Sequence, residues 1–198
     1  MRDGHGPVRL LAPPLRAIVD RLTFNAAITE TGRDLDARSR LRYMKITVRS
    51  AVGSDLPSLL ALYSELNPDD APLTQESADA IWASISSQRG RTVLVAEADG
   101  VVVGTADCMV LPNLTRGGRS ILFVENVVVT DSCQRQGIGK QLMEAAMRLG
   151  ESAGCYKVQL LAADDEYVHL FYESCGFKPL AQGFRRYIDQ DQRSGVLV

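Results

Sequence analysis

From about Met44 onward, the pattern of apolar and polar residues predicts a series of strands and helices. Residues 45–49 alternate with a period of two, which is typical of a half-buried strand. Apolar residues then recur at helical spacing after a capping residue at Ser54 or Asp55, and again after Thr74, which predicts two helices. The two apolar faces consist of Leu56, Leu59, Leu60 and Tyr63, and of Ala78, Ile81, Trp82 and Ile85.

The rest of the chain continues with a hairpin and then alternates strand and helix. Asp99 and Gly100 tolerate positive φ and are typical of the tight turn that joins two antiparallel strands. The expected elements are strands at 91–98, 101–111, 121–129 and 157–161, helices at 139–153 and 166–175, and final strands at Phe177 and 184–188. A hairpin followed by strand–helix–strand predicts an α/β fold, with a mixed sheet covered by helices on both faces.

Length and composition indicate one globular domain. The chain has 198 residues, of which 45% are hydrophobic and 23% are charged. This composition excludes a disordered chain, which would lack the apolar surface that offsets chain entropy. No apolar stretch approaches the ~20 residues of a membrane helix, so no membrane association is expected. The formal charge of −2 gives no reason to expect nucleic acid as a partner.

Residues 1–43 differ from the remainder and are interpreted as an N-terminal extension, a tail or an upstream artefact. The first 42 residues contain eight Arg and five acidic residues, a net charge of +3, and they show no sustained periodicity. They have no apolar core followed by a cleavage site, which argues against a secretory signal. The folded domain is therefore expected to span residues 44–198.

The cysteines and histidines give no sign of a metal site. The four cysteines are Cys108, Cys133, Cys155 and Cys175. Their wide spacing excludes zinc-knuckle and thioredoxin-like motifs, and the composition is typical of a reducing, cytoplasmic protein. Cys108 and Cys155 lie among apolar residues and are expected to be buried. Two histidines, His5 and His169, are too few for a typical histidine metal site.

A glycine-containing turn after an apolar strand is the sharpest chemical motif. The valines at 127–129 lead through a loop to Gly137 and Gly139 at the start of a predicted helix. Such a turn exposes backbone N–H groups, and the helix dipole adds partial positive charge, so together they favour a phosphate. Glycine matters because a side chain would hold the phosphate away. Arg135 and Lys140 add positive charge nearby, although both are also compatible with solvated positions.

Two familiar phosphate-binding motifs do not fit this turn. A P-loop needs Gly at the position of Gln134 and Ser or Thr at the position of Gln141. A dinucleotide fingerprint needs Gly or Ala at the position of Leu142, and it follows the first strand of a doubly wound sheet.

A third motif matches in two places. Residues 134–139 read QRQGIG, which resembles the Gln/Arg-x-x-Gly-x-Gly/Ala signature of the GNAT superfamily of N-acetyltransferases. Residues 171–177 read FYESCGF and are similar to a second segment of that family. The resemblance covers about residues 45–188 and implies acetyl-coenzyme A as co-substrate. The coenzyme contacts that it implies are Val127, Val128, Val129, Gln134, Arg135, Gln136, Gly137, Ile138, Gly139, Lys140 and Phe171.

A further segment points to one branch of the family. Residues 154–158 read GCYKV and resemble the branch of glucosamine-6-phosphate and aminoalkylphosphonate acetyltransferases. Glu166 departs from the pattern, because that family often has Asn six residues before the tyrosine.

The resemblance also implies a mechanism, which is direct attack in a ternary complex without a covalent intermediate. Tyr172 is the candidate general acid for the departing thiolate, with a core aromatic role as the alternative. Glu125 is the candidate base, and it is equally compatible with a solvated strand edge. His169 is interpreted as a packing or surface residue. Cys133 has no base or oxyanion pattern beside it and is not interpreted as a nucleophile.

Three functions stay open at the level of sequence. The first is acetylation of the primary amine of a small molecule, the second is acetylation of a protein lysine or N-terminus, and the third is a non-catalytic acyl-coenzyme A binding module. Arg116 and Arg119 are equally compatible with contacts to an anionic acceptor and with solvated loop positions. A homodimer is plausible for the family.

Overall fold

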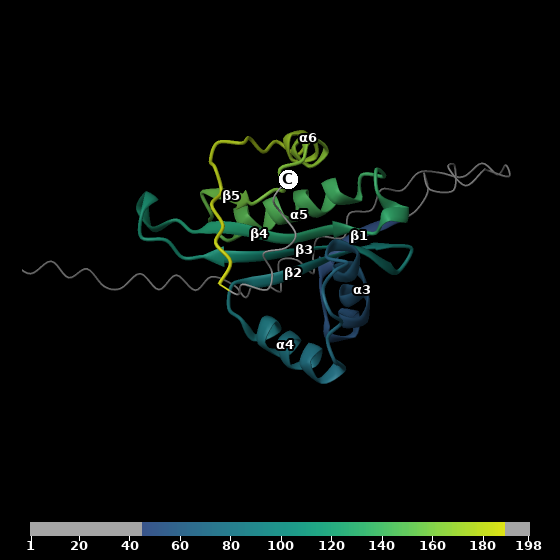
Figure 1. Ribbon diagram of the computed structural model, residues 1–198. Coiled ribbons are helices and arrows are strands. Elements are labelled where there is room, and N and C mark those ends of the chain that lie inside the picture. Colours follow the sequence, from purple (N-terminus) through teal and green to yellow (C-terminus); the bar gives the residue numbers. More distant parts are fainter. Residues whose placement is uncertain (1–44, 189–198) are drawn as a thin grey trace, which may run out of the picture. The chain divides into compact units, whose positions relative to one another are not determined.

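The computed structural model describes residues 45–188 and divides them into two compact units after Leu160. Figure 1 shows the elements in chain order. The predicted extension at residues 1–43, like Met44, lies outside the described residues, so the domain boundary stays a prediction. No helix within residues 45–188 is both long enough and apolar enough to cross a bilayer.

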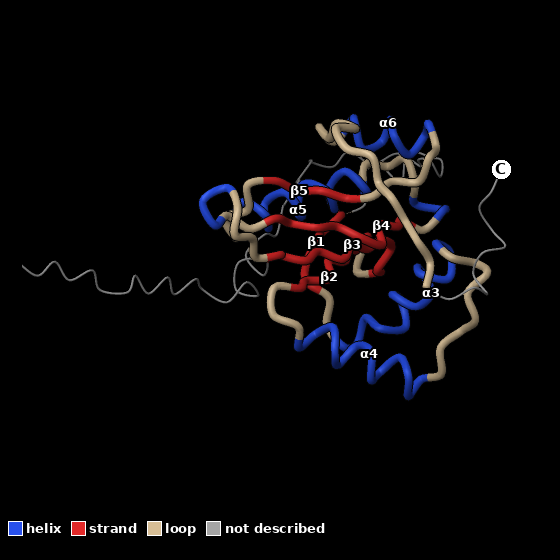
Figure 2. The backbone as a smooth tube through the Cα atoms, turned by 60° about the vertical axis from the view of Figure 1, so that its left-hand side comes forward, coloured by secondary structure: helices blue, strands red, loops and turns tan. Residues whose placement is uncertain are grey.

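The first unit is built on a mixed five-stranded sheet, which confirms the predicted fold class. Its strands are β1 (Ile46–Ser50), β2 (Arg91–Ala98), β3 (Val101–Leu111), β4 (Ile121–Val129) and β5 (Lys157–Leu160), arranged in that order. All neighbours are antiparallel except β4 and β5, which are parallel. Figure 2 shows the strands of this sheet side by side. The bounds of β2, β3 and β4 are those predicted from the sequence.

Helices cover both faces of this sheet. Helices α3 (Leu56–Leu66) and α4 (Gln75–Ser87) lie on one face, and α5 (Ile138–Ser152) lies on the other (Figure 1). The predicted apolar residues of α5, namely Leu142, Ala146 and Leu149, are all at most 1% exposed. Ile81 was expected on the buried face of α4 but is 46% exposed, because α4 packs through Ala78, Trp82 and Ile85.

A glycine lets the sheet and α5 approach closely where β4 ends. A Cβ atom at Gly104 of β3 would lie 3.0 Å from the carbonyl oxygen of Val128 and 3.1 Å from a methyl group of Val129. It would also lie 3.2 Å from Leu142 of α5. Contacts this short leave no room for a side chain. Gly104 therefore fixes how the end of β4 is seated between β3 and α5.

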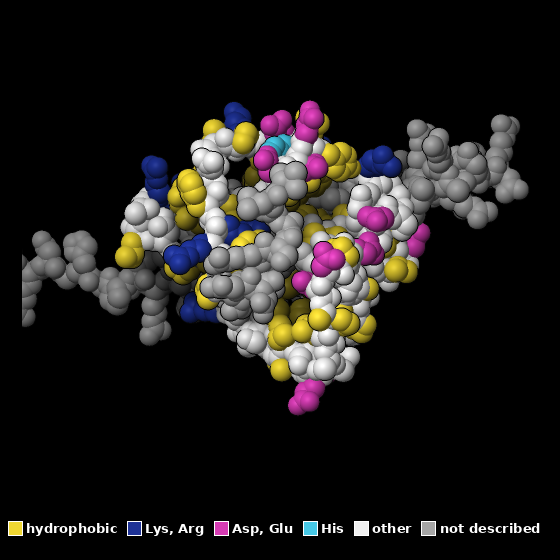
Figure 3. All heavy atoms as spheres, viewed as in Figure 1, with side chains coloured by type: hydrophobic (Ala, Val, Ile, Leu, Met, Phe, Trp, Pro, Cys, Tyr) yellow, Lys and Arg dark blue, Asp and Glu magenta, His cyan; other side chains and the backbone are white. Residues whose placement is uncertain are grey.

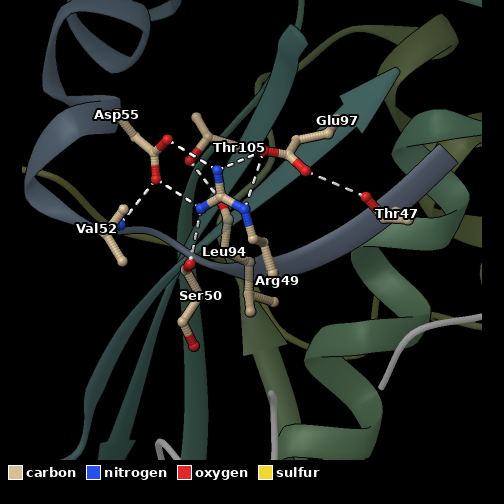
Figure 4. A network of polar contacts seen from close by, with 8 residues as sticks. All are labelled: Thr47, Arg49, Ser50, Val52, Asp55, Leu94, Glu97 and Thr105. Atoms are coloured by element: carbon tan, nitrogen blue, oxygen red, sulfur yellow. Dashed lines mark hydrogen bonds and ion pairs between the residues drawn. The ribbon is translucent and has the colours of Figure 1, made fainter. Parts of the chain in front are cut away.

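An ion-pair network, here called the Arg49 network, joins β1 to β2 and to the start of α3 (Figure 4). Arg49 donates to both carboxylate oxygens of Asp55, at 2.6 and 2.9 Å, and its Nε donates to Glu97 at 3.0 Å. Asp55 also accepts the backbone N–H of Val52 at 2.8 Å. Hydrogen bonding by Arg49 lowers the pKa of Asp55 although its burial opposes this. The network anchors the entry of α3 to the sheet.

In its described residues, 161–188, the second unit contains one helix, α6 (Glu166–Ser174). Asp165 caps it by accepting the backbone N–H of Val168 at 3.0 Å. The final strands predicted at Phe177 and at residues 184–188 are wrong, since no strand follows β5 in the described part of the chain. Phe184 is 90% exposed and Ile188 is 95% exposed, so the apolar pattern there does not mark the buried face of a sheet.

Candidate active site

Strand β4 changes its pairing with both neighbouring strands at Glu125. Its first four residues, Ile121–Val124, pair with β5, whereas residues 125–129 extend beyond that pairing. The register with β3 also shifts here, because Asp107 is opposite Glu125 but Thr105 is opposite Val128. Asn126 takes a left-handed conformation with φ of 52°. Such a bulge bends the strand and redirects its backbone groups, often beside active sites.

The segment between β4 and α5, residues 130–137, is here called the β4–α5 turn. Arg135 and Gly137 are left-handed, with φ of 57° and 82°, and Gly137 is the N-cap of α5. No side chain among the described residues caps this helix end. A Cβ atom built on Gly137 would meet nothing within 4 Å, so the space in front of the turn is open. The first N–H groups of α5 therefore end at an open space that suits an anion.

Two glutamines brace the turn from within. Gln134 donates from Nε2 to the carbonyl oxygen of Val129 at 3.0 Å and to Asp131 Oδ1 at 2.8 Å. Gln136 donates to the carbonyl oxygen of Ser132 at 3.1 Å. Both side chains are therefore engaged inside the turn. The backbone N–H of Gln134 also donates within the turn, to the carbonyl oxygen of Asp131 at 3.3 Å, so a phosphate contact from a backbone N–H group is expected of Gln136 only.

The other predicted residues of this region lie around the turn with different exposures. Ile138 is 1% exposed, so its side chain anchors the start of α5 in the core and only its backbone can face a ligand. Arg135 and Lys140 are exposed. Val128 is 9% exposed, and Val127 and Val129 are partly buried. The structure thus brings the predicted residues from Val127 to Lys140 together in one strand–turn–helix unit.

A buried polar cluster lies beside Glu125 and was not predicted from the sequence. Asp107, the register partner of Glu125, is 1% exposed and paired with Arg91, whose Nε donates to both its oxygens at 3.0 and 3.1 Å. Burial of Tyr63 of α3, followed by the charge of Asp107, raises the pKa of its phenol. A single acidic residue inside the otherwise apolar strand β3 was the signal that could have revealed this cluster.

Phe171 and Tyr172 lie on α6 in the second unit. Gly176, with φ of 87°, ends α6, and the backbone N–H of Phe177 returns to the carbonyl oxygen of Tyr172 at 3.0 Å. This is the hydrogen-bond pattern of a helix C-cap, and it brings the ring centroids of Tyr172 and Phe177 to 6.0 Å. Part of the second motif is therefore explained by helix termination. The coenzyme contact of Phe171 and the acid role of Tyr172 stay predictions.

The remaining candidates do not add to the site. Burial raises the pKa of the fully buried Cys108 thiol, as expected, whereas Cys155 is only partly buried. Arg116 lies 6.0 Å from the ring centroid of Tyr156, and Arg119 donates to the carbonyl oxygen of Cys155. These two arginines precede β4 and so lie at the opposite end of that strand from the β4–α5 turn. Residues 45–188 contain no cluster of three His, Cys, Asp or Glu side chains that could hold a metal ion.

Comparison with known proteins gives consistent matches. The model of the acetyltransferase (GNAT) family matches residues 57–177. The glucosamine 6-phosphate N-acetyltransferase of Trypanosoma brucei brucei is 35% identical over 63% of this chain and 84% of its own. The aminoglycoside N(6')-acetyltransferase type 1 of Klebsiella aerogenes is 30% identical over 68% of this chain and 91% of its own. A solved structure from Agrobacterium tumefaciens str. C58 has a TM-score of 0.70 and 42% identity, covering 71% of this chain and 99% of that one.

Proposed function

Because the chain belongs to the GNAT family of acetyltransferases, we propose that it transfers the acetyl group of acetyl-coenzyme A to the primary amine of a small molecule. The family assignment confirms the resemblance seen in the motifs. The protein is an N-acetyltransferase, and acetyl-coenzyme A is its co-substrate. The observation that carries the proposal for the site is the open β4–α5 turn at the uncapped start of α5.

The β4–α5 turn would hold the pyrophosphate of the coenzyme. Its left-handed residues Arg135 and Gly137 redirect successive backbone N–H groups, as in other anion-binding nests. The positive end of the α5 dipole strengthens these contacts. The exposed side chains of Arg135 and Lys140 add charge beside them. With its pyrophosphate held here, the coenzyme can extend its thioester toward the part of β4 that continues beyond β5.

The acceptor amine must lose a proton to attack the thioester. An alkyl ammonium has a pKa near ~10 and is mostly protonated at neutral pH, so the site must desolvate it or supply a base. We assign the base to Glu125, acting directly or through water. Its cross-strand neighbour Asp107 is paired with Arg91, which compensates the negative charge that Glu125 would otherwise face. Glu125 can then accept a proton from the ammonium group of the acceptor.

Attack by the amine forms a C–N bond and a tetrahedral oxyanion. Backbone N–H groups of residues 127–129 are the proposed oxyanion donors, since this part of β4 extends past its pairing with β5. Collapse of the intermediate breaks the C–S bond and releases the coenzyme A thiolate. Tyr172 protonates that thiolate. Both substrates are bound together, so proximity lowers the barrier without a covalent enzyme intermediate.

The acceptor class that we propose is an amino sugar. The two relatives above are named for glucosamine 6-phosphate and for aminoglycosides, both of which carry amines on sugar rings. Glu65, in the last turn of α3, is an exposed carboxylate at the β4–α5 turn. Figure 3 shows acidic side chains spread over the face in view. A negative surface next to the coenzyme turn favours a cationic acceptor. Arg116 and Arg119 precede β4 and lie toward the end of that strand opposite the β4–α5 turn.

The proposal is tested by thiol release from acetyl-coenzyme A with a panel of acceptors. The panel contains glucosamine 6-phosphate, an aminoglycoside, a lysine-containing peptide and a blank without acceptor. We expect thiol release to exceed the blank with at least one amino sugar and to be slower with the peptide. Fastest release with the peptide would instead identify a protein acetyltransferase. Binding of acetyl-coenzyme A without release in any reaction would identify a binding module.

A further inference from the structure

Glu65 connects the last turn of α3 to the start of the β4–α5 turn. Its Oε1 accepts the hydroxyl of Thr130 at 2.8 Å, and its Oε2 accepts the backbone N–H of Asp131 at 3.1 Å. Thr130 itself donates its backbone N–H to the carbonyl oxygen of Val103 in β3 at 2.9 Å. The point where the chain leaves β4 is therefore held from two sides, by the sheet and by a carboxylate 65 residues away in sequence.

We propose that Glu65 is a positioning residue for coenzyme binding, an inference that rests on the proposed role of the β4–α5 turn. Both oxygens of Glu65 are engaged by successive residues at the first bend of that turn. Gln134 and Gln136 brace the same turn further along the chain, whereas Glu65 ties its first residues to α3. A turn that is already ordered spares the coenzyme the entropy of ordering it.

The negative charge of Glu65 opposes coenzyme binding, whereas its positioning contacts favour it. A carboxylate near a bound pyrophosphate repels it, although exposed charges are screened over about 8 Å at physiological salt. If repulsion dominated, removal of the carboxylate would strengthen coenzyme binding, most clearly at low salt. If positioning dominates, removal weakens binding. The sign of the change in affinity therefore distinguishes the two effects.

The test measures the acetyl-coenzyme A dissociation constant by calorimetry, together with the melting temperature and steady-state kinetics. Variants Glu65→Ala, Glu65→Gln, Thr130→Val and the double variant Glu65→Ala/Thr130→Val are compared with the parental protein. Ser64→Ala is the matched control, because its hydroxyl bonds only within α3, to the carbonyl oxygen of Leu60. Glu65→Gln removes the charge but keeps one oxygen that can accept a hydrogen bond.

We expect Glu65→Ala to raise the dissociation constant about threefold to tenfold, as the loss of charge-assisted hydrogen bonds at an exposed site implies. Glu65→Gln should lie between Glu65→Ala and the parental protein. Thr130→Val should weaken binding on its own but add nothing in the Glu65→Ala background. The KM for acetyl-coenzyme A should rise while kcat stays within about twofold. This pattern is expected when a variant weakens binding of the substrate and of the transition state by the same amount.

Two results would overturn the inference while leaving the coenzyme site intact. One is parental or tighter binding by Glu65→Ala. The other is full additivity of Glu65→Ala and Thr130→Val. If Glu65→Ala fails to fold, Glu65→Gln and Thr130→Val decide the question in the same assay. A parental protein that does not bind acetyl-coenzyme A would instead remove the proposed site and this role together.

Discussion

Two polar regions of the first unit differ in where their hydrogen-bonding groups point. In the Arg49 network, three charged side chains are directed at one another, and Asp55 also accepts a backbone N–H (Figure 4). In the β4–α5 turn, the side chains of Gln134 and Gln136 are engaged internally, but the end of α5 at Gly137 carries no side-chain cap. The charged groups of the Arg49 network are therefore paired with one another. The start of α5, by contrast, has no side-chain cap and faces an open space.

This difference separates residues that support the fold from residues that support the reaction. Polar groups that satisfy one another stabilise the protein, and their loss exposes an uncompensated charge. Groups held rigidly at an open space can bind a ligand without further ordering. The comparison therefore predicts that changes in the Arg49 network affect stability alone, and that changes at the proposed site affect binding or turnover alone.

The largest expected effect concerns Tyr172, the proposed acid. Tyr172→Phe keeps the ring and its packing with Phe177 but removes the proton that the thiolate needs. We expect kcat to fall about 100- to 10,000-fold with little change in acetyl-coenzyme A affinity, because a general acid acts mainly in the transition state. Tyr167→Phe on the same helix is the control, since Tyr167 is 59% exposed. Parental turnover by Tyr172→Phe would make Tyr172 a packing residue.

The second effect concerns the Arg49 network. Arg49→Met leaves the buried Asp55 and its neighbour Glu97 without their cation. We expect the free energy of unfolding in urea to fall by about 2–3 kcal/mol, below the range for fully buried pairs because Arg49 is partly exposed. Acetyl-coenzyme A affinity of the folded variant should not change. A parallel loss of affinity would show that the network and the β4–α5 turn are not separable.

The smallest effect is the pH dependence of that network. The pKa of Asp55 is lower in the folded protein than its ordinary value, so its stabilisation is fully present above about pH 4 and is lost as the pH falls through the folded pKa. Urea unfolding of the parental protein and of Asp55→Asn should therefore differ most near pH 7. The difference should shrink below pH 4. A constant difference from pH 7 to pH 3 would mean that Arg49 does not act on an ionised Asp55.

The parts of this molecule that were predictable from the sequence are those that local pattern determines. Apolar runs and the Asp99-Gly100 turn defined β2, β3 and β4, and Gly137 marked a turn because a left-handed residue favours glycine. The contacts of Glu65 with Thr130 and of Arg91 with Asp107 were missed, since they depend on how distant segments meet. The false strand at 184–188 shows the reverse error, in which apolar and aromatic residues indicate a strand that does not form.

The central claim is that the β4–α5 turn binds the coenzyme pyrophosphate, and one pair of variants tests it most directly. Gly137 and Gly154 lie just outside opposite ends of α5, both are left-handed with φ of 82° and 67°, and a Cβ atom at either would meet nothing within 4 Å. Asparagine tolerates this conformation better than most residues, so Gly137→Asn and Gly154→Asn introduce similar strain and no internal clash.

Calorimetry with acetyl-coenzyme A then compares the two variants with the parental protein, after their melting temperatures show that both are folded. The account predicts that Gly137→Asn weakens binding by more than about tenfold, because its side chain occupies the space of the phosphate, while Gly154→Asn binds as the parental protein does. Parental affinity in a folded Gly137→Asn variant would contradict the account.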